Sequence, residues 1–206
     1  MVAKFPQLYL ASSSPRRAEL LTQIGVQFAV IDADCDETPL PAEAPRDYVQ
    51  RMARLKANTG SAEMVAQQLP LRPILAADTA VICNARILGK PRDVHDAATM
   101  LRLLSGRRHQ VLTAVALLIP TPKPQEWLAL SKSDVTFRTL SEAEITWYCR
   151  TGEPLDKAGS YGIQGYGALF VTALNGSYSG VMGLPICETG RLLKQAGIAL
   201  MLPTEN

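Results

Sequence analysis

Residues 8–21 read LYLASSSPRRAELL, a short apolar run that passes through serines into a helix-like pattern. Leu8 to Ala11 is apolar and short, which predicts a buried strand. Ser14 and Pro15 are typical of a helix start, because serine can cap the free amides and proline fits the first turn. We therefore predict a helix from Arg16 to Gln23 directly after the strand.

Strands and helices alternate irregularly along the rest of the chain, and some neighbouring strands read as hairpins. Further strands are predicted at Val26–Ile31, Ile74–Cys83, Ile87–Leu88, Val111–Ile119, Leu128–Thr139 and Ala168–Leu174. Further helices are predicted at Arg46–Asn58, after Gly60, from Asp93 or Asp96 to Gly106, from the Ser141 capping box to Gly152, and at Pro185–Ala196. This order favours the α/β class with a mixed sheet flanked by helices, and not a regular doubly wound array.

The composition limits the classes to which this protein can belong. Of 206 residues, 47% are hydrophobic and 19% are charged, so a full core can form and global disorder is excluded. The length suits one domain over residues 1–206, with room for two lobes. The formal net charge of +2 argues against nucleic-acid and membrane partners, because both favour a strongly basic surface.

Cysteine use and the N-terminal stretch bear on the cellular location. The four cysteines lack CxxC spacing and are expected to be reduced thiols. Neither histidine lies near a cysteine or the other histidine in sequence, which argues against a zinc site. The apolar stretch near the N-terminus is too short for a signal peptide, and no run reaches the roughly 18 apolar residues of a membrane span. We therefore expect a cytoplasmic protein.

The polar turn at the start of the first helix is a candidate anion site. Ser14, Arg16 and Arg17 surround a helix N-terminus, where free amides attract anions. Two arginines in a first turn oppose the helix dipole unless an anion is bound beside them. The alternative is a plain helix cap with two solvated arginines, and the pattern favours neither interpretation.

A carboxylate inside an apolar strand is the second unusual feature. Asp78 interrupts the apolar run Ile74–Cys83, and burying a carboxylate is costly unless a cation, a metal or hydrogen-bond donors meet it. The alternative is a structural aspartate paired with an arginine. Glu37, in an acidic stretch, could supply a second oxygen ligand for a divalent cation. For Asp32, Asp34 and Asp36 in that stretch we prefer a solvated loop.

Three lysines occupy constrained places in the sequence. Lys56 shares a helix face with apolar residues, Lys90 stands between a glycine and a proline, and Lys157 precedes a glycine-rich loop. Each could instead be an ordinary surface lysine. The loop glycines match neither a dinucleotide fingerprint nor a P-loop. Together the three features describe a phosphate ester bound with a divalent ion by an α/β enzyme.

The chain also resembles a known family along nearly its whole length. The segment at residues 8–21 looks like the signature of the Maf family of nucleotide pyrophosphatases. Further matches occur in family order at residues 54–57, 77–79, 89–93, 104–106, 109–111, 113–115, 156–165, 176–178 and 181–185. The resemblance implies a fold like that of Maf and inosine triphosphatase proteins, with a curved mixed sheet and an active-site cleft between two lobes.

The resemblance also implies an activity. Members of the family hydrolyse nucleoside triphosphates between the α- and β-phosphates with a divalent cation, expected to be Mg²⁺ or Mn²⁺, and are often homodimers. The segment from Gly162 to Gly165 is similar to the branch that acts on dTTP and UTP, and clearance of modified pyrimidine nucleotides is a further expectation. Two alternatives are a 7-methyl-GTP pyrophosphatase and a nucleotide-sensing regulator of septum formation and cell division.

The resemblance assigns roles to individual residues. Asp78 would accept the proton of the attacking water and share metal binding with Glu37. The residues expected to bind the substrate phosphates are Ser14, Arg17, Lys56 and Lys90. The residues expected to select the base are Arg16, Thr79 and Gln164.

Overall fold

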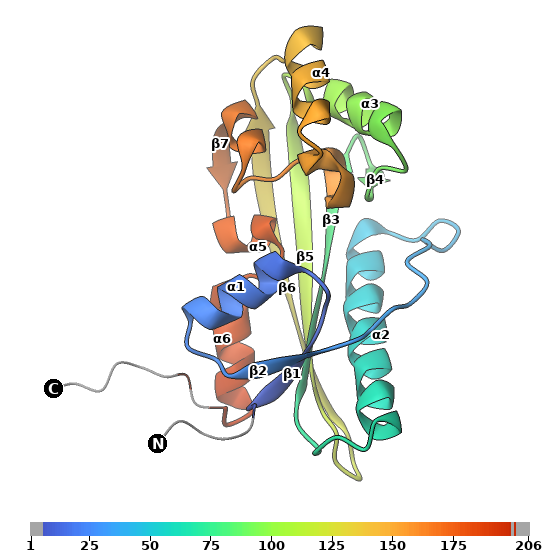
Figure 1. The fold of residues 1–206 in the computed structure, drawn as a ribbon, viewed down its shortest axis with the longest axis vertical. Helices are drawn as coiled ribbons and strands as arrows, with labels where there is room; N and C mark the ends of the chain where they lie inside the picture. The colour runs from blue at the N-terminus through green and yellow to red at the C-terminus, as the bar shows by residue number, and fades with distance from the viewer. Residues whose placement is uncertain (1–5, 199, 201–206) are drawn as a thin grey trace, which may run out of the picture. The chain divides into compact units, whose positions relative to one another are not determined.

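The structure, a computed structural model, describes residues 6–198 and 200, which form a seven-stranded mixed sheet flanked by helices (Figure 1). The strands are β1 (Leu8–Ala11), β2 (Phe28–Ile31), β3 (Ile74–Cys83), β4 (Arg86–Leu88), β5 (Arg108–Ile119), β6 (Gln125–Phe137) and β7 (Val171–Asn175). The α-helices are α1 (Pro15–Gln23), α2 (Pro45–Ala66), α3 (Val94–Leu104), α4 (Glu142–Arg150), α5 (Tyr178–Met182) and α6 (Ile186–Gln195). Short 3-10 helices follow α4 at Glu153–Asp156, Ala158–Ser160 and Tyr166–Phe170.

The pairing of the strands confirms the predicted α/β class with a mixed sheet. The order is β2-β1-β3-β5-β6-β7, and β4 pairs with β3. β1 is parallel to β2 and to β3, whereas β4 on β3 and β7 on β6 are antiparallel. None of the helices in the described residues is long and apolar enough to cross a membrane.

The chain divides into two compact units. The first comprises residues up to Asp78, Ala114–Leu130 and the chain from Gly183 onward, and the second comprises Thr79–Thr113 and Ser131–Met182. Because β3, β5 and β6 each continue from one unit into the other, both units contain part of these strands. The residues Asp78 and Thr79, adjacent in β3, therefore belong to different units.

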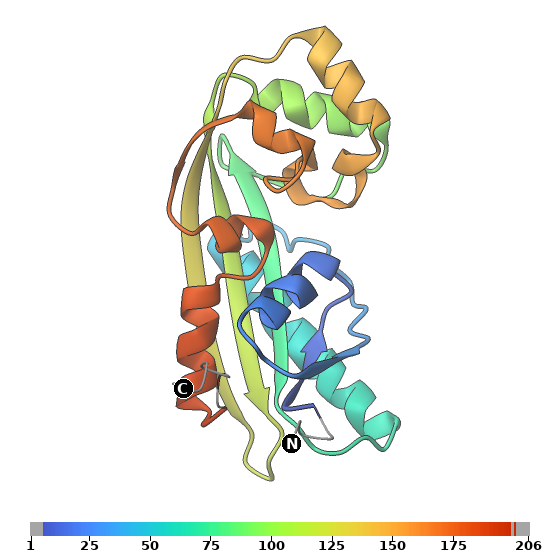
Figure 2. The ribbon, with the colours of Figure 1, turned by 60° about the vertical axis from the view of Figure 1, so that its left-hand side comes forward.

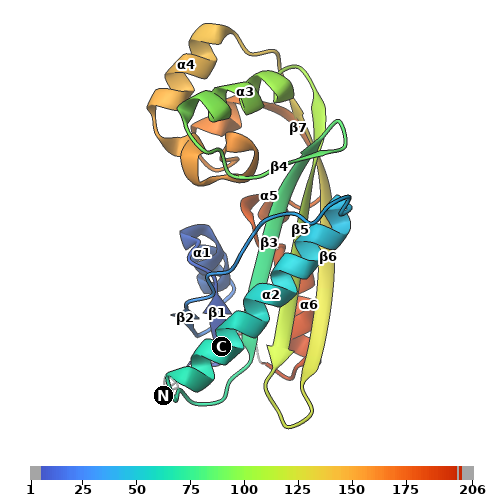
Figure 3. The ribbon, with the colours of Figure 1, turned by 90° about the vertical axis from the view of Figure 1, so that its right-hand side faces the viewer.

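In the first unit the parallel strands bring two polar segments to the same level of the sheet. Leu10 of β1 pairs with Val30 of β2 and with Leu75 of β3. β1 ends at Ala11, whereas β3 continues to Cys83, so the turn that follows β1 comes level with Asp78 in the middle of β3. α2 packs against β1 and β2, and Figure 3 shows that this long helix extends well beyond both short strands.

The prediction of a helix break before Gly60 is wrong, because α2 continues through it to Ala66. A Cβ at position 60 would lie 2.9 Å from Ala11 Cβ and 3.2 Å from Ile74 Cγ2. The glycine is needed for the close approach of the helix to β1 and β3, and it is not a helix end. Sequence pattern assigns glycine to helix ends by default, which explains the error.

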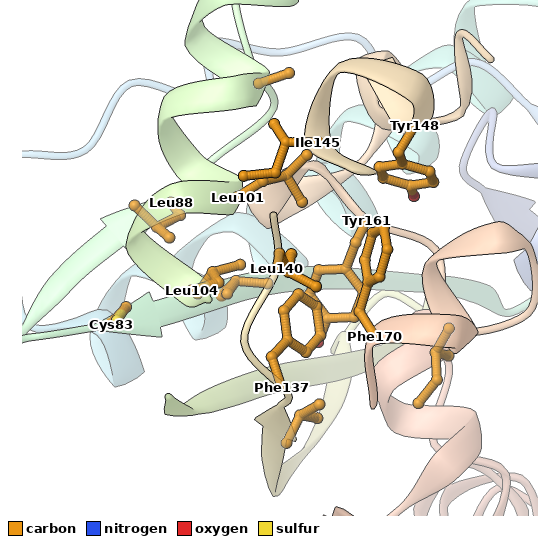
Figure 4. Close-up of a cluster of buried hydrophobic side chains, with 14 of the residues drawn as sticks. Cys83, Leu88, Leu101, Leu104, Phe137, Leu140, Ile145, Tyr148, Tyr161 and Phe170 are labelled. Atoms are coloured by element: carbon orange, nitrogen blue, oxygen red, sulfur yellow. The ribbon is translucent and has the colours of Figure 1, made fainter. Parts of the chain in front are cut away.

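The second unit has its own aromatic core. Phe137, Tyr148, Tyr161 and Phe170 meet edge to face, with ring centroids 4.7–5.9 Å apart (Figure 4). α3 and α4 cover this core and lie side by side, as the green and orange helices in Figure 2 show. The predicted capping box at Ser141 is confirmed, because its hydroxyl accepts from Glu144 N–H while the Glu144 carboxylate accepts from Ser141 N–H.

In the second unit a predicted strand start shifts, and one of the two predicted starts of α3 is confirmed. The strand predicted from Ala168 begins only at Val171, because residues Tyr166–Phe170 form a 3-10 helix in which Ala168 N–H donates to Gly165 O. Of the two candidate starts for α3, Asp93 is the cap, and its carboxylate accepts from Asp96 N–H at 2.8 Å.

Candidate active site

The centre of the candidate site is the Asp78 carboxylate in the first unit. Its residue is only 5% exposed, and its Oδ1 accepts a hydrogen bond from Lys56 Nζ at 2.7 Å. Glu37 Oε1 lies 2.7 Å from the same ammonium. The carboxylates of Asp78 and Glu37 therefore both contact the ammonium of Lys56, which belongs to α2. We call Arg17, Glu37, Lys56 and Asp78 the Asp78 cluster.

Burial and the neighbouring opposite charges act in opposite directions on the pKa of Asp78 and on the pKa of Lys56. Burial raises the pKa of Asp78, and the nearby Lys56 and Arg17 offset only part of that effect. Burial alone would lower the pKa of Lys56, but the charge of the Asp78 carboxylate and the hydrogen bonds that Lys56 donates to both acids outweigh it and raise the pKa. Lys56 therefore remains an ammonium at neutral pH, and Asp78 binds a proton more readily than a solvated aspartate does.

Arg17 joins the cluster from the first turn of α1. Its Nε donates to Gly183 O at 2.8 Å and one terminal nitrogen donates to Ser12 Oγ at 3.0 Å. Burial lowers its pKa, with the Asp78 charge opposing that effect, but a guanidinium stays protonated in proteins. Arg16 lies near enough to lower the pKa of Arg17 further. These two cations stand where the α1 dipole is already positive.

Ser14 takes the cap position of α1 without using its side chain as a cap. Its backbone is extended, its hydroxyl makes no capping hydrogen bond, and its N–H donates to Ser12 Oγ at 3.2 Å. The first turn of α1 contains no acidic residue. The helix start thus combines amides and guanidiniums with no carboxylate of its own, which is the charge pattern of an anion site.

The loop that carries Glu37 is anchored by two residues of α2 that the sequence analysis did not single out. Tyr48 Oη donates to Glu37 O at 2.9 Å. Arg51 donates to Thr38 O at 3.1 Å and pairs with Glu43, which lowers the pKa of Glu43 to about 2. Local sequence carries no sign of these long-range bonds, nor of the contact between Arg17 and Gly183.

Three other predicted site residues, Thr79, Lys90 and Gln164, belong to the second unit. Thr79 Oγ1 is 3.0 Å from Thr113 Oγ1, and Thr113 donates in turn to Gly180 O. Lys90 is exposed, and the carbonyl of the preceding Gly89 accepts from Gly159 N–H at 3.1 Å. Gln164 is exposed in the glycine-rich loop. Lys157, also in this unit, bonds to Asp156 and to a backbone carbonyl.

The residues present fit a divalent cation that also contacts a phosphate. Asp78 and Glu37 supply two carboxylates directed at one cationic group, and Mg²⁺ is often bound by one or two carboxylates together with substrate phosphates. Among residues 6–198 and 200 there is no group of three or more His, Cys, Asp or Glu that could hold a metal without such help. Asp32 and Asp36 accept from backbone N–H groups two residues on, as solvated loop residues do.

Comparisons with known proteins identify the family and several relatives with named activities. The family model described as Maf-like protein matches residues 7–196. A dTTP/UTP pyrophosphatase of Dechloromonas aromatica (strain RCB) is 52% identical over 199 residues, covering 93% of this chain and 98% of that protein. A dTTP/UTP pyrophosphatase of Ralstonia nicotianae (strain ATCC BAA-1114 / GMI1000) is 52% identical over 204 residues, covering 96% and 98%. A solved HAM1 protein from Coxiella burnetii has a TM-score of 0.46 and 15% identity, covering 93% and 100%.

Proposed function

The chain belongs to the Maf-like protein family, and from this membership we propose that it hydrolyses dTTP and UTP to the nucleoside monophosphate and pyrophosphate. The relatives of the same length that bear this activity in their names support the substrate. The main structural support for hydrolysis is the buried Asp78 carboxylate beside the cationic groups of Lys56 and Arg17. A base and two cations within one cluster suit the attack of water on a phosphate.

Most of the groups that we assign to phosphate binding belong to the first unit. Arg17 and the free amides of α1 bind phosphate oxygens, and the Ser14 hydroxyl, which makes no capping bond, donates to another. Lys56 offsets charge that develops on the phosphate oxygens, and electrostatic stabilisation of this kind is usually the largest contribution to catalysis. We also assign a phosphate-binding role to Lys90.

Asp78 orients a water molecule and accepts its proton as the water oxygen attacks the α-phosphorus and the bond to pyrophosphate breaks. A carboxylate whose pKa is raised by burial is a better base than a solvated one. Lys56 holds Oδ1 in place and keeps the group ionised before the proton arrives. General-base assistance of this kind is worth roughly 10²- to 10⁴-fold in rate.

Glu37 and Asp78 would hold the divalent cation, Mg²⁺ or Mn²⁺. When bound, the cation supplies charge neutralisation of the phosphate oxygens. Selection of the base is assigned to Arg16, Thr79 and Gln164, of which Gln164 offers an amide that can both donate and accept. The four cysteines are free thiols, which supports our proposal of a cytoplasmic location.

The test is a panel of dTTP, UTP, dCTP, GTP and 7-methyl-GTP with released pyrophosphate as the readout. Steady turnover of dTTP and UTP at catalytic protein concentration, above that of the other three, supports the proposal. Tight binding without pyrophosphate release would instead indicate a nucleotide sensor. Preference for 7-methyl-GTP would overturn the assignment of the base.

A further inference from the structure

The loop that carries Gln164 folds around a side chain to which neither the sequence nor the proposed reaction gives a role. This side chain is Glu153, which follows α4 in the second unit. Its Oε1 accepts from Tyr148 Oη at 2.8 Å and from Gly167 N–H at 3.1 Å, and its Oε2 accepts from Tyr166 N–H at 2.9 Å. One carboxylate thus gathers three donors from two segments of chain.

Tyr148 extends the same network to the other side of Gln164. Its hydroxyl donates to Glu153 and accepts from Gly162 N–H at 3.1 Å. Tyr148 is fully buried in the aromatic core, and burial together with the Glu153 hydrogen bond raises its pKa, so the hydroxyl keeps its proton. The backbone is therefore held at position 162 before Gln164 and at positions 166 and 167 after it.

The glycines of the loop are placed by this network. A Cβ at Gly165 would overlap the Glu153 carboxylate, and a Cβ at Gly162 would lie 3.0 Å from Glu153 Oε1. A Cβ at Gly167 would lie 2.9 Å from Tyr148 Oη and 2.7 Å from Gly162 O. Only glycine lets the chain approach the carboxylate and the phenol this closely. Ile163 is buried beside Gln164, whereas Gln164 itself is exposed.

We propose that Glu153 and Tyr148, together called the clamp, are positioning residues that hold the Gln164 loop (residues 162–167) in the conformation that selects thymine or uracil. A side chain that selects a substrate must be held close to the geometry in which it binds that substrate. A short exposed loop such as the one that carries Gln164 does not supply this rigidity by itself. This positioning role rests on the proposed function, because the proposed function is what assigns selection of the base to Gln164. The clamp acts on selectivity and substrate affinity, because the groups proposed to bind phosphate, apart from Lys90, belong to the first unit.

The chemistry of the clamp requires a carboxylate and not only a side chain of that shape. In Glu153→Gln one acceptor oxygen becomes an NH₂ group, which turns a donor toward a backbone N–H or the Tyr148 hydroxyl. In Tyr148→Phe the ring is retained, but Glu153 loses one donor and Gly162 N–H loses its acceptor. Glu144→Gln is the matched control, because Glu144 also accepts from a backbone N–H and an arginine, but these partners are Ser141 and Arg138, outside residues 162–167.

The first measurement is amide hydrogen exchange of residues 162–167 without nucleotide. Losing a hydrogen bond to a charged group should accelerate exchange there by about tenfold or more in both clamp variants and leave it unchanged in Glu144→Gln. The second is kcat and KM for dTTP, UTP, dCTP and GTP. The clamp variants should raise KM for dTTP and UTP about tenfold, with kcat falling less and with the dCTP and GTP constants little changed.

The outcomes separate this proposal from the proposed function. A wild-type protein with no preference for dTTP and UTP over dCTP and GTP overturns the proposed function and the selectivity role together, and the wild type alone reveals it. Unchanged exchange at residues 162–167 in Glu153→Gln overturns the clamp whatever the wild type prefers. Faster exchange with an equal loss of kcat/KM for all four nucleotides overturns the selectivity role, because that is the effect of a merely destabilised fold.

Discussion

The ammonium of Lys56 and the Oδ1 oxygen of Asp78 lie 2.7 Å apart, with both side chains at most 12% exposed. A buried ion pair contributes little net stability, because desolvation of both charges offsets their attraction, but removing one partner leaves the other charge uncompensated. The pair therefore constrains every experiment on the site, and the two residues need to be tested singly and together.

Replacing Asp78 with asparagine should abolish most of the activity while leaving the fold intact. The amide has the same size but cannot accept the proton of the attacking water, so kcat should fall by roughly 10²- to 10⁴-fold. Pyrophosphate release from dTTP, measured beside thermal unfolding, checks this. Turnover near that of the wild type in a folded Asp78→Asn protein would contradict the assignment of Asp78.

Replacing Lys56 with methionine should lower the free energy of unfolding at pH 7 by about 3–5 kcal/mol, because Asp78 is left as a buried charge without its main partner. Loss of Lys56 raises the pKa of Asp78 beyond its already raised position. Above pH ~4 the folded variant then binds more protons than the unfolded chain, so its stability falls as pH rises and recovers in acid.

Adding Asp78→Asn to Lys56→Met should restore most of the lost stability, since no buried charge is then left unpaired. Chemical denaturation of the wild type, the two single variants and the double variant gives the coupling between the residues. A Lys56→Met protein as stable as the wild type at pH 7, with the same pH dependence, would show that the pair is not buried as described.

Buried His109 should make stability depend on pH in the mildly acidic range. The residue is 2% exposed, its Nε2 is 2.9 Å from Tyr161 Oη, and burial lowers its pKa from 6.5 to about 4. Between these values the unfolded chain binds a proton that the folded chain does not, so stability falls as pH drops from 6.5 to 4. The full effect is roughly 3 kcal/mol.

Free energies of unfolding between pH 4 and 7 test this for the wild type and for His109→Gln. The variant should lose this part of the pH dependence, although it is less stable at neutral pH. His95→Gln is the control, because His95 is exposed on α3. Identical slopes for the wild type and His109→Gln would mean that His109 is protonated in the folded protein.

Two glycines in helices should respond in opposite ways to substitution by alanine. In Gly60→Ala the new methyl meets Ala11 Cβ at 2.9 Å, and overpacking of this kind costs about 1–3 kcal/mol, more than the gain in helix propensity. In Gly190→Ala of α6 the nearest atom is 3.8 Å away, so the gain of roughly 1 kcal/mol remains. Opposite shifts in the denaturation midpoint are expected, and stabilisation by both would contradict the packing of α2 on β1.

Residues of the site that break a local sequence pattern could be predicted from the sequence, whereas contacts between separated segments could not. Asp78, Lys56 and Glu37 each broke a local pattern or stood in an acidic stretch, and the structure brings them together. Gly183, which accepts from Arg17, and Tyr48, which holds the Glu37 loop, lie far from their partners in sequence and carry no local sign of these contacts. The Gly60 error has the same origin, since its tertiary packing overrides a local rule.

Recognition of the base and binding of the phosphates are assigned to different residues, so substitutions can separate the two functions. Gln164 is exposed on a clamped loop of the second unit, whereas Arg17 belongs to the Asp78 cluster of the first unit. Gln164→Ala should reduce kcat/KM for dTTP and UTP by about 5- to 150-fold relative to dCTP and GTP, because a lost hydrogen bond to the base costs roughly 1–3 kcal/mol. Arg17→Ala should reduce kcat/KM for all four alike, because every substrate carries the same triphosphate. A uniform loss in Gln164→Ala would mean that the loop acts on the phosphates, and a base-dependent loss in Arg17→Ala would mean that the guanidinium reads the nucleobase.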